Sequence, residues 1–266
     1  MDRTSLDSIL ARVSKPSRYL GNEVNVIRKD FDKAAVRVAL VFPDKYEIGM
    51  SHVGLKILYE ILNRLPDVVA ERCFAPDLDM EAALRKEGFP LFSLESKRPL
   101  KDFDLIGFSL TYELTYINML AILDLAGIPL WQKDRKEGDP LILAGGGCTM
   151  NAEPVADFLD AAVIGDGEEV ILEIVEALRQ GKIPPRPPFS KGGDPFPEEL
   201  NFPPLKKGGR GDFLERLAGI EGVYVPSFFN PEYNSDGTLK RMIPLKPGYE
   251  KIKKRIVSNI DTAVYP

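Results

Sequence analysis

The sequence predicts an α/β protein built around a doubly wound, parallel, five-stranded sheet. Two observations predict it. Short apolar runs alternate with helical patterns across residues 35–182, and the first run, VRVALVF at 36–42, is continuously apolar, as in a strand buried on both faces. Strands separated by helices pair in parallel through right-handed crossovers. We therefore expect a Rossmann-like sheet in the flavodoxin-like strand order 2-1-3-4-5.

Each element has its own signal in the sequence. The expected strands are 36–42, 68–76, 104–110, 140–147 and 161–167. The first helix is expected at 51–65, where apolar residues recur at spacings of three and four until Pro66 ends the pattern. The next helix has Asp77 or Asp79 as its cap and Gly88 as its stop. The later helices are expected at 112–127 and 168–181.

The chain divides into four segments by composition. These are a lead-in at 1–34, the Rossmann-like domain at 35–182, a Pro/Gly-rich stretch at 183–212 and a C-terminal part at 213–266. The third segment carries the near repeat PPFSKGG and PPLKKGG. A segment of this composition cannot bury enough apolar surface to offset the conformational entropy lost on ordering. We expect it to be a disordered insertion, with a proline-rich docking motif as the alternative. The last segment predicts a short helix, then a β-hairpin that turns at Asp236-Gly237 between GVYVPSFF and TLKRMIPL.

Charge and cysteine content exclude several classes of function. The net charge of −5 argues against a nucleic-acid partner, and no apolar run is long enough for a membrane span. Two cysteines, Cys73 and Cys148, and one histidine are too few for a four-cysteine zinc or iron–sulfur site. We expect a cytoplasmic protein without a signal peptide, and we expect His52 to cap or pack a helix.

Unusual loops follow four of the expected strands. In open parallel sheets, ligands bind beyond the carboxyl ends of the strands, where the strand order reverses. Glycines there let a bulky ligand approach the backbone, and hydroxyls can line the crevice. Each loop is also explained as an ordinary turn or cap, but four on one rim predict a ligand site. Its candidate residues are Asp44, Tyr46, Gly49, Ser109, Thr111, Gly145, Gly146, Gly147, Gly165, Gly167 and Glu168.

These loops resemble a family signature. The pattern D-x-H-x-x-G, then S-x-L, then G-G marks cobalamin-binding Rossmann-like domains, and this chain has DKYEIG, SLT and GG in those places. The phrase AAVIGDGEE resembles the segment that closes this domain in B12-dependent radical SAM proteins. Longer phrases, among them FPDKYEIGMSHVGLKILYEILN and DFDLIGFSLTYELTYINML, are similar to the N-terminal half of uncharacterised fused radical SAM proteins with a B12-binding domain. The resemblance covers most of residues 17–180 and 213–266.

The resemblance implies a cobalamin held at the rim of the sheet. Asp44, Tyr46 and Gly49 would lie below the corrin, and the nucleotide tail would enter the crevice near Ser109 and Gly145–Gly147. The partner would be a radical SAM domain of the same parent chain, which would carry a 4Fe-4S cluster and S-adenosylmethionine. The radical SAM cysteine motif is absent from this sequence. We therefore expect this chain to be the N-terminal portion of a longer enzyme. We expect no catalysis from this portion alone.

One departure keeps two functions open. Tyr46 stands where the family has the histidine that ligates cobalt. This implies either cobalamin bound without a protein imidazole, or a non-catalytic structural or substrate-recruiting module that has lost the vitamin. A flavodoxin-like site for another nucleotide cofactor is a third alternative. It is disfavoured because FPDKYEIGM is poor in the Ser, Thr and Gly of a phosphate loop.

Overall fold

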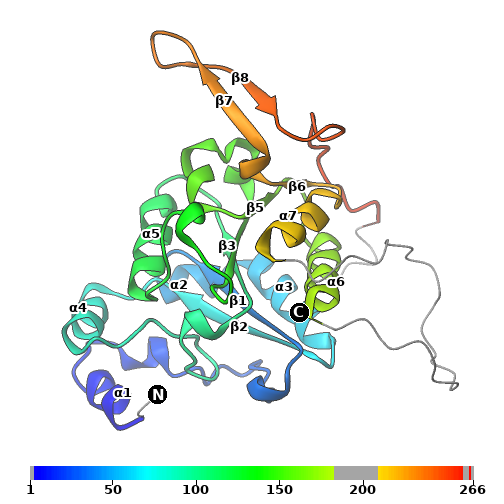
Figure 1. Cartoon of the computed structure of the whole chain (residues 1–266). Coiled ribbons are helices and arrows are strands. Elements are labelled where there is room, and N and C mark those ends of the chain that lie inside the picture. The colour runs from blue at the N-terminus through cyan, green and yellow to red at the C-terminus, as the bar shows by residue number, and fades with distance from the viewer. Residues whose placement is uncertain (1–2, 183–208, 260–263, 265–266) are drawn as a thin grey trace, which may run out of the picture.

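The computed structural model describes residues 3–182, 209–259 and 264. A sheet of six strands, in the order β2-β1-β3-β4-β5-β6, runs through its centre (Figure 1). The strands are β1 (Val36–Phe42), β2 (Val68–Phe74), β3 (Leu105–Ser109), β4 (Leu141–Gly145), β5 (Ala161–Val163) and β6 (Val223–Tyr224). The helices are α1 (Arg3–Leu10), α2 (Tyr46–Gly49), α3 (Val53–Arg64), α4 (Leu78–Glu87), α5 (Thr115–Leu125), α6 (Val170–Lys182) and α7 (Arg210–Ala218).

The first five strands confirm the predicted topology. They pair in parallel in the order 2-1-3-4-5, so the direction of winding reverses between β1 and β3. The sixth strand was not predicted. β6 pairs antiparallel with β5 and closes that edge of the sheet. The chain is therefore α/β and Rossmann-like, with an added antiparallel edge strand.

The C-terminal hairpin is present, but one of its strands differs from the prediction. β7 (Phe229–Tyr233) pairs with β8 (Leu239–Pro244), and the turn includes Gly237 at a φ of +84°. The expected first strand, GVYVPSFF, is instead divided between β6 and a short 3-10 turn at Pro226–Phe228. Pro226 has no N–H to donate to a ladder, so the pairing of β6 stops before it. Figure 1 shows the hairpin projecting beyond the main sheet.

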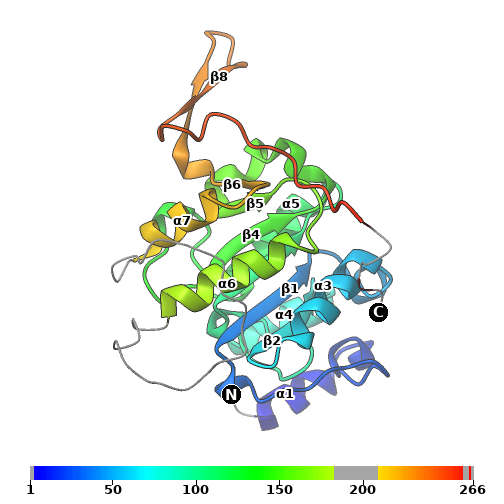
Figure 2. The ribbon, with the colours of Figure 1, turned by 90° about the vertical axis from the view of Figure 1, so that its right-hand side faces the viewer.

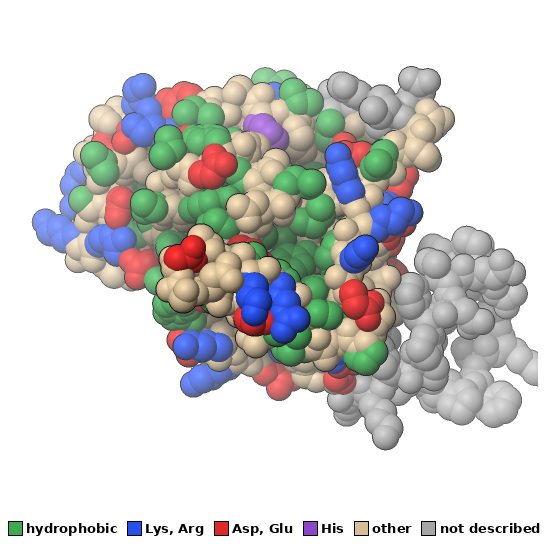
Figure 3. Space-filling view, turned by 90° about the horizontal axis from the view of Figure 1, so that it is seen from above, with side chains coloured by type: hydrophobic (Ala, Val, Ile, Leu, Met, Phe, Trp, Pro, Cys, Tyr) green, Lys and Arg blue, Asp and Glu red, His purple; other side chains and the backbone are tan. Residues whose placement is uncertain are grey.

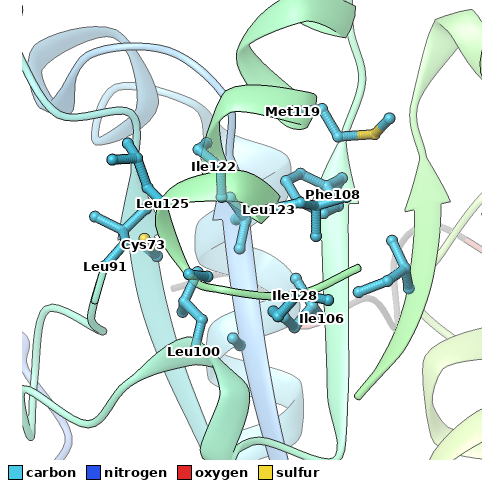
Figure 4. Packing of buried hydrophobic residues seen from close by; sticks show 14 of the residues in the cluster. Cys73, Leu91, Leu100, Ile106, Phe108, Met119, Ile122, Leu123, Leu125 and Ile128 are labelled. Atoms are coloured by element: carbon cyan, nitrogen blue, oxygen red, sulfur yellow. The ribbon is translucent and has the colours of Figure 1, made fainter. Parts of the chain in front are cut away.

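Two hydrophobic layers hold the helices on opposite faces of the sheet. On β1, Ala39 and Val41 belong to the core beneath α4 and α5, whereas Val38 and Leu40 belong to the core beneath α3, α6 and α7. Figure 4 shows part of the first layer, where Met119 lies beside Phe108 of β3. The side chains of both cores are buried, and each fully buried aliphatic side chain contributes about 1.5–3 kcal/mol relative to exposure. The prediction that β1 is buried on both faces is confirmed.

Local caps place the helices where the sequence predicts them. His52 precedes α3 as its N-cap, and its Nδ1 accepts a hydrogen bond from the Leu55 N–H at 3.1 Å, which confirms the expected capping role. Asp77 caps α4 through the Leu78 N–H, and Gly88 ends that helix in the left-handed region at a φ of +62°. These caps fix the two helix starts that face the carboxyl ends of β1 and β2.

The predicted insertion at 183–212 lies outside the described residues up to position 208, and α7 begins at Arg210. None of the helices in the described part of the chain is long and apolar enough to cross a membrane.

Candidate ligand pocket at the carboxyl ends of the strands

A pocket lies between the sheet and the helices α3 and α6. It opens at the carboxyl ends of β3, β4 and β5 and has a volume of about 350 Å³. This is within the range expected of a small-molecule site. Its lining residues are Leu40, His52, Gly54, Leu58, Leu105, Gly107, Phe108, Ser109, Thr111, Leu143, Ala144, Gly145, Gly146, Gly147, Val163, Gly165, Asp166, Gly167, Glu168, Ile171 and Ile174.

Two strand glycines form the floor of this pocket. A Cβ built on Gly145 meets no atom within 4 Å, and one built on Gly107 meets only a Leu40 side-chain carbon at 3.8 Å. Neither glycine is therefore needed to relieve crowding within the protein. The missing side chains instead leave exposed backbone and free space at the centre of the sheet, where a flat group can lie against it.

Gly146 has a different reason to be glycine. Its φ is +105°, and a Cβ there would lie 2.6 Å from the carbonyl oxygen of Leu110. The Gly146 carbonyl accepts a hydrogen bond from Thr149 Oγ1 at 2.8 Å, and the same hydroxyl lies 2.6 Å from the Val163 carbonyl oxygen. Gly146 therefore shapes the turn after β4, as the ordinary interpretation of a glycine run predicts, and it lines the pocket as well.

The polar groups of the pocket lie at its mouth. Ser109 and Thr111 are half-buried where β3 ends, and Asp166 and Glu168 lie between β5 and α6. His52 also lines the pocket, and burial lowers the pKa of its imidazole, which favours the uncharged ring. Seen from the hairpin side, hydrophobic side chains gather in the middle of this face, with acidic and basic side chains around them (Figure 3). A mostly apolar pocket with a few polar groups at its entrance fits a largely uncharged ring system.

The three candidates of the first loop lie elsewhere. Asp44, Tyr46 and Gly49 are not among the lining residues of this pocket. Asp44 accepts hydrogen bonds from the Tyr112 hydroxyl and from the Lys45 N–H. The structure thus brings eight of the eleven candidate residues, from Ser109 to Glu168, around one pocket and leaves the three candidates of the D-x-Y-x-x-G loop outside its lining.

Packing accounts for the other two residues of that loop. The Tyr46 hydroxyl donates to Glu23 Oε1 at 2.9 Å, and its ring meets Phe74 edge-on at 5.6 Å between centroids. Burial, and then the hydrogen bond to Glu23, raise the pKa of Tyr46 to about 12. Gly49 is buried in α2, where a Cβ would lie 2.3 Å from the Phe74 ring. Gly49 therefore allows a close approach of α2 to β2.

Sequence reasoning missed several lining residues from the helices. Gly54, Leu58, Ile171 and Ile174 come from α3 and α6, because the pocket extends under those helices and is not confined to the rim. Gly107 carried a usable signal, since a glycine inside a buried strand often marks a close approach by a ligand or another backbone.

Within residues 3–182, 209–259 and 264, no group of three or more His, Cys, Asp or Glu side chains is placed to hold a metal ion. Cys73 and Cys148 are both free and buried. Burial raises the pKa of the Cys73 thiol, which keeps it protonated and unreactive.

Comparisons with known proteins agree with this architecture at the level of family. The profile of the family described as "Radical SAM proteins, N-terminal" matches residues 54–186. An uncharacterised protein of Methanocaldococcus jannaschii is 26% identical over 148 residues, which are 54% of this chain and 27% of that protein. This chain thus spans about a quarter of the length of that relative. No solved structure matches this chain. Because the profile covers half of the sequence, the chain belongs to the family of N-terminal regions of radical SAM proteins.

Proposed function

We propose that this chain is a corrinoid-binding N-terminal module of a radical SAM protein. The pocket between the sheet and α3 and α6 would receive the nucleotide tail of cobalamin, and the corrin would lie over the carboxyl ends of the strands. The radical SAM domain of the same parent chain would face it there. The 4Fe-4S cluster and S-adenosylmethionine belong, in this proposal, to that other domain, because no metal-binding cluster is found among the described residues.

The observation that carries the proposal is the glycine floor of the pocket. Gly107 and Gly145 come from neighbouring strands, and Gly107 pairs with Leu143, two residues before Gly145. Around Gly145 a Cβ would meet nothing, so the space is kept open without any packing reason. Flat aromatic bases need such a surface, and the apolar side chains of Leu58, Ile171 and Ile174 line the same pocket. The mostly apolar lining therefore suits the flat base of the nucleotide tail.

The residues of the chain would bind the tail and leave the cobalt free of a protein imidazole. The Tyr46 hydroxyl donates to Glu23 and the ring packs on Phe74, and these contacts hold the side chain outside the pocket lining. The Nδ1 atom of His52 accepts the hydrogen bond that caps α3, so in the uncharged ring the proton lies on Nε2 and that atom has no free lone pair for cobalt. A corrinoid, when bound, supplies a cobalt centre that can carry a methyl group or take part in electron transfer. The tail pocket would fix its position, and the apolar helix side chains would exclude water around the base.

The alternative is a structural or substrate-recruiting module without cobalamin. A specific observation favours it: every candidate residue of the first loop is used in packing or hydrogen bonding inside the protein. In this alternative the D-x-Y-x-x-G loop buttresses β1 and β2, and the pocket receives no corrinoid.

Titration with hydroxocobalamin separates the two functions. The proposal predicts a change in the visible absorbance of the corrinoid on binding, and red colour retained after desalting. Cobinamide, which lacks the nucleotide tail, is the matched control. We expect it to bind weaker by about 100-fold or more, because burial of the tail contributes several kcal/mol. If no colour is retained, the structural alternative is supported. If both corrinoids bind equally well, the nucleotide tail does not bind in this pocket.

A further inference from the structure

The extended segment of residues 250–259, here called the strap, returns to the pocket from the C-terminal hairpin. Figure 2 shows it in red, running from the hairpin past the end of β5 towards the first turn of α6. Arg255 forms an isolated parallel bridge with Gly165. Gly165 lines the pocket, so the strap lies directly behind part of the pocket wall.

The backbone of Arg255 completes the end of β5. Its N–H donates to the Ile164 carbonyl at 2.9 Å, and its carbonyl accepts from the Asp166 N–H at 3.1 Å. Such contact requires glycine on the other side, because a Cβ on Gly165 would lie 2.0 Å from the Arg255 carbonyl oxygen. The Val257 N–H then donates to Asp166 Oδ2 at 2.9 Å. The strap therefore supplies three of the hydrogen bonds made by the loop between β5 and α6, through Ile164, the Asp166 N–H and the Asp166 carboxylate.

The side chain of Arg255 ties the same strap to α6. Its Nη2 lies 2.9 Å from Glu169 Oε2 and 2.8 Å from Glu173 Oε1, and these two carboxylates raise the pKa of the guanidinium. Ile171 and Ile174 of the same helix line the pocket. One residue thus joins two parts of the wall, the β5–α6 loop and the first turns of α6.

We propose that Arg255 is a positioning residue for the ligand pocket. It is not among the lining residues of the pocket and acts by holding Gly165 and the start of α6 at the spacing that a bound base requires. This rests on the proposed function, namely that the pocket receives the tail of a corrinoid. By linkage, a ligand that requires this wall must also stabilise the docked strap.

The test compares two alanine substitutions in the strap of the full chain. Arg255→Ala removes both ion pairs and leaves the backbone bridge. Lys253→Ala is the matched control, because Lys253 is 82% exposed and pairs with Glu221, away from the pocket. We expect Arg255→Ala to weaken hydroxocobalamin binding by about three- to tenfold, as two partly exposed ion pairs imply, and Lys253→Ala to leave it within about twofold. Arg255→Lys keeps one charge without the fork and should restore part of the affinity.

Hydrogen exchange gives the second measurement. Arg255→Ala should speed exchange of the amides at 164–168 relative to Lys253→Ala, and hydroxocobalamin should slow exchange at 253–257 in the unchanged protein. Equal affinities and equal exchange in the two variants would overturn the positioning role while the proposed function survives. If the unchanged protein does not bind hydroxocobalamin, the proposed function fails. The exchange comparison without ligand then decides alone whether Arg255 positions this wall.

Discussion

Two neighbouring regions of the same rim differ in what fills them. The loop after β1 is closed by large side chains: Tyr46 packs on Phe74, and α2 sits so close to β2 that only glycine fits at position 49. The ends of β3 and β4 are hollow, because Gly107 and Gly145 leave the sheet uncovered beneath α3 and α6. Both regions contain a glycine at a strand end or just beyond one. The difference shows that a glycine marks a ligand site only where the missing Cβ leaves space unfilled.

The largest effect is expected from filling the hollow region. In Gly145→Val the new side chain enters space that is empty for at least 4 Å around the Cβ, so the fold should remain and the pocket should close. We expect hydroxocobalamin affinity to fall by about 100-fold or more, with little change in Tm. Absorbance titration and thermal unfolding measure the two quantities separately.

Two further variants make this test sharp. Gly211→Val places the same side chain in open space on α7, where it should alter neither binding nor the pocket. Gly146→Val should instead destabilise the protein, by about 2 kcal/mol or more, because the position has a φ of +105° and a Cβ would meet the Leu110 carbonyl oxygen at 2.6 Å. Unchanged affinity in Gly145→Val would show that the hollow region is not the binding site.

The filled region should respond in the opposite way. Gly49→Ala forces a methyl group against the Phe74 ring, which would lie 2.3 Å from the new Cβ unless α2 moves. We expect a loss of about 1–3 kcal/mol in the free energy of unfolding, which denaturant titration measures. Gly211→Ala, in an open helical position, should be neutral or slightly stabilising. A stability of Gly49→Ala equal to that of the unchanged protein would mean that α2 is not packed as the structure shows.

The fold could be predicted from the sequence because its signals are local and repeated. The run at 36–42 became β1 without a change of boundary, and Asp77 and Gly88 mark both ends of α4. β6 could not be predicted, since only Val223 and Tyr224 form it and their pairing depends on where α7 delivers the chain. A two-residue strand carries no periodicity, so its existence is a property of the tertiary structure.

The candidate site was predictable in part for the same reason. Glycines and hydroxyls follow β3, β4 and β5 directly, and the carboxyl ends of parallel strands lie at the same edge of a sheet. Their position in the sequence therefore predicts that they lie close together, and the structure places them around one cavity. The direction of Tyr46 depends on Glu23 and Phe74, which lie far from it in the sequence. The position of the strap is harder still to predict, because Arg255 and Gly165 are 90 residues apart in the sequence and no sequence motif indicates their contact.

The smallest expected effect tests whether the filled region takes any part in binding. Tyr46→Phe keeps the ring on Phe74 and removes only the hydroxyl that donates to Glu23 at 2.9 Å. Loss of a hydrogen bond to a carboxylate should lower the free energy of unfolding by about 1–2 kcal/mol. Because Tyr46 lies outside the pocket, hydroxocobalamin affinity should stay within about twofold, since a site that does not touch the ligand adds independently. A larger loss of affinity, or a shifted corrinoid spectrum in Tyr46→His, would place the corrin over the loop after β1 and join the two regions into one site.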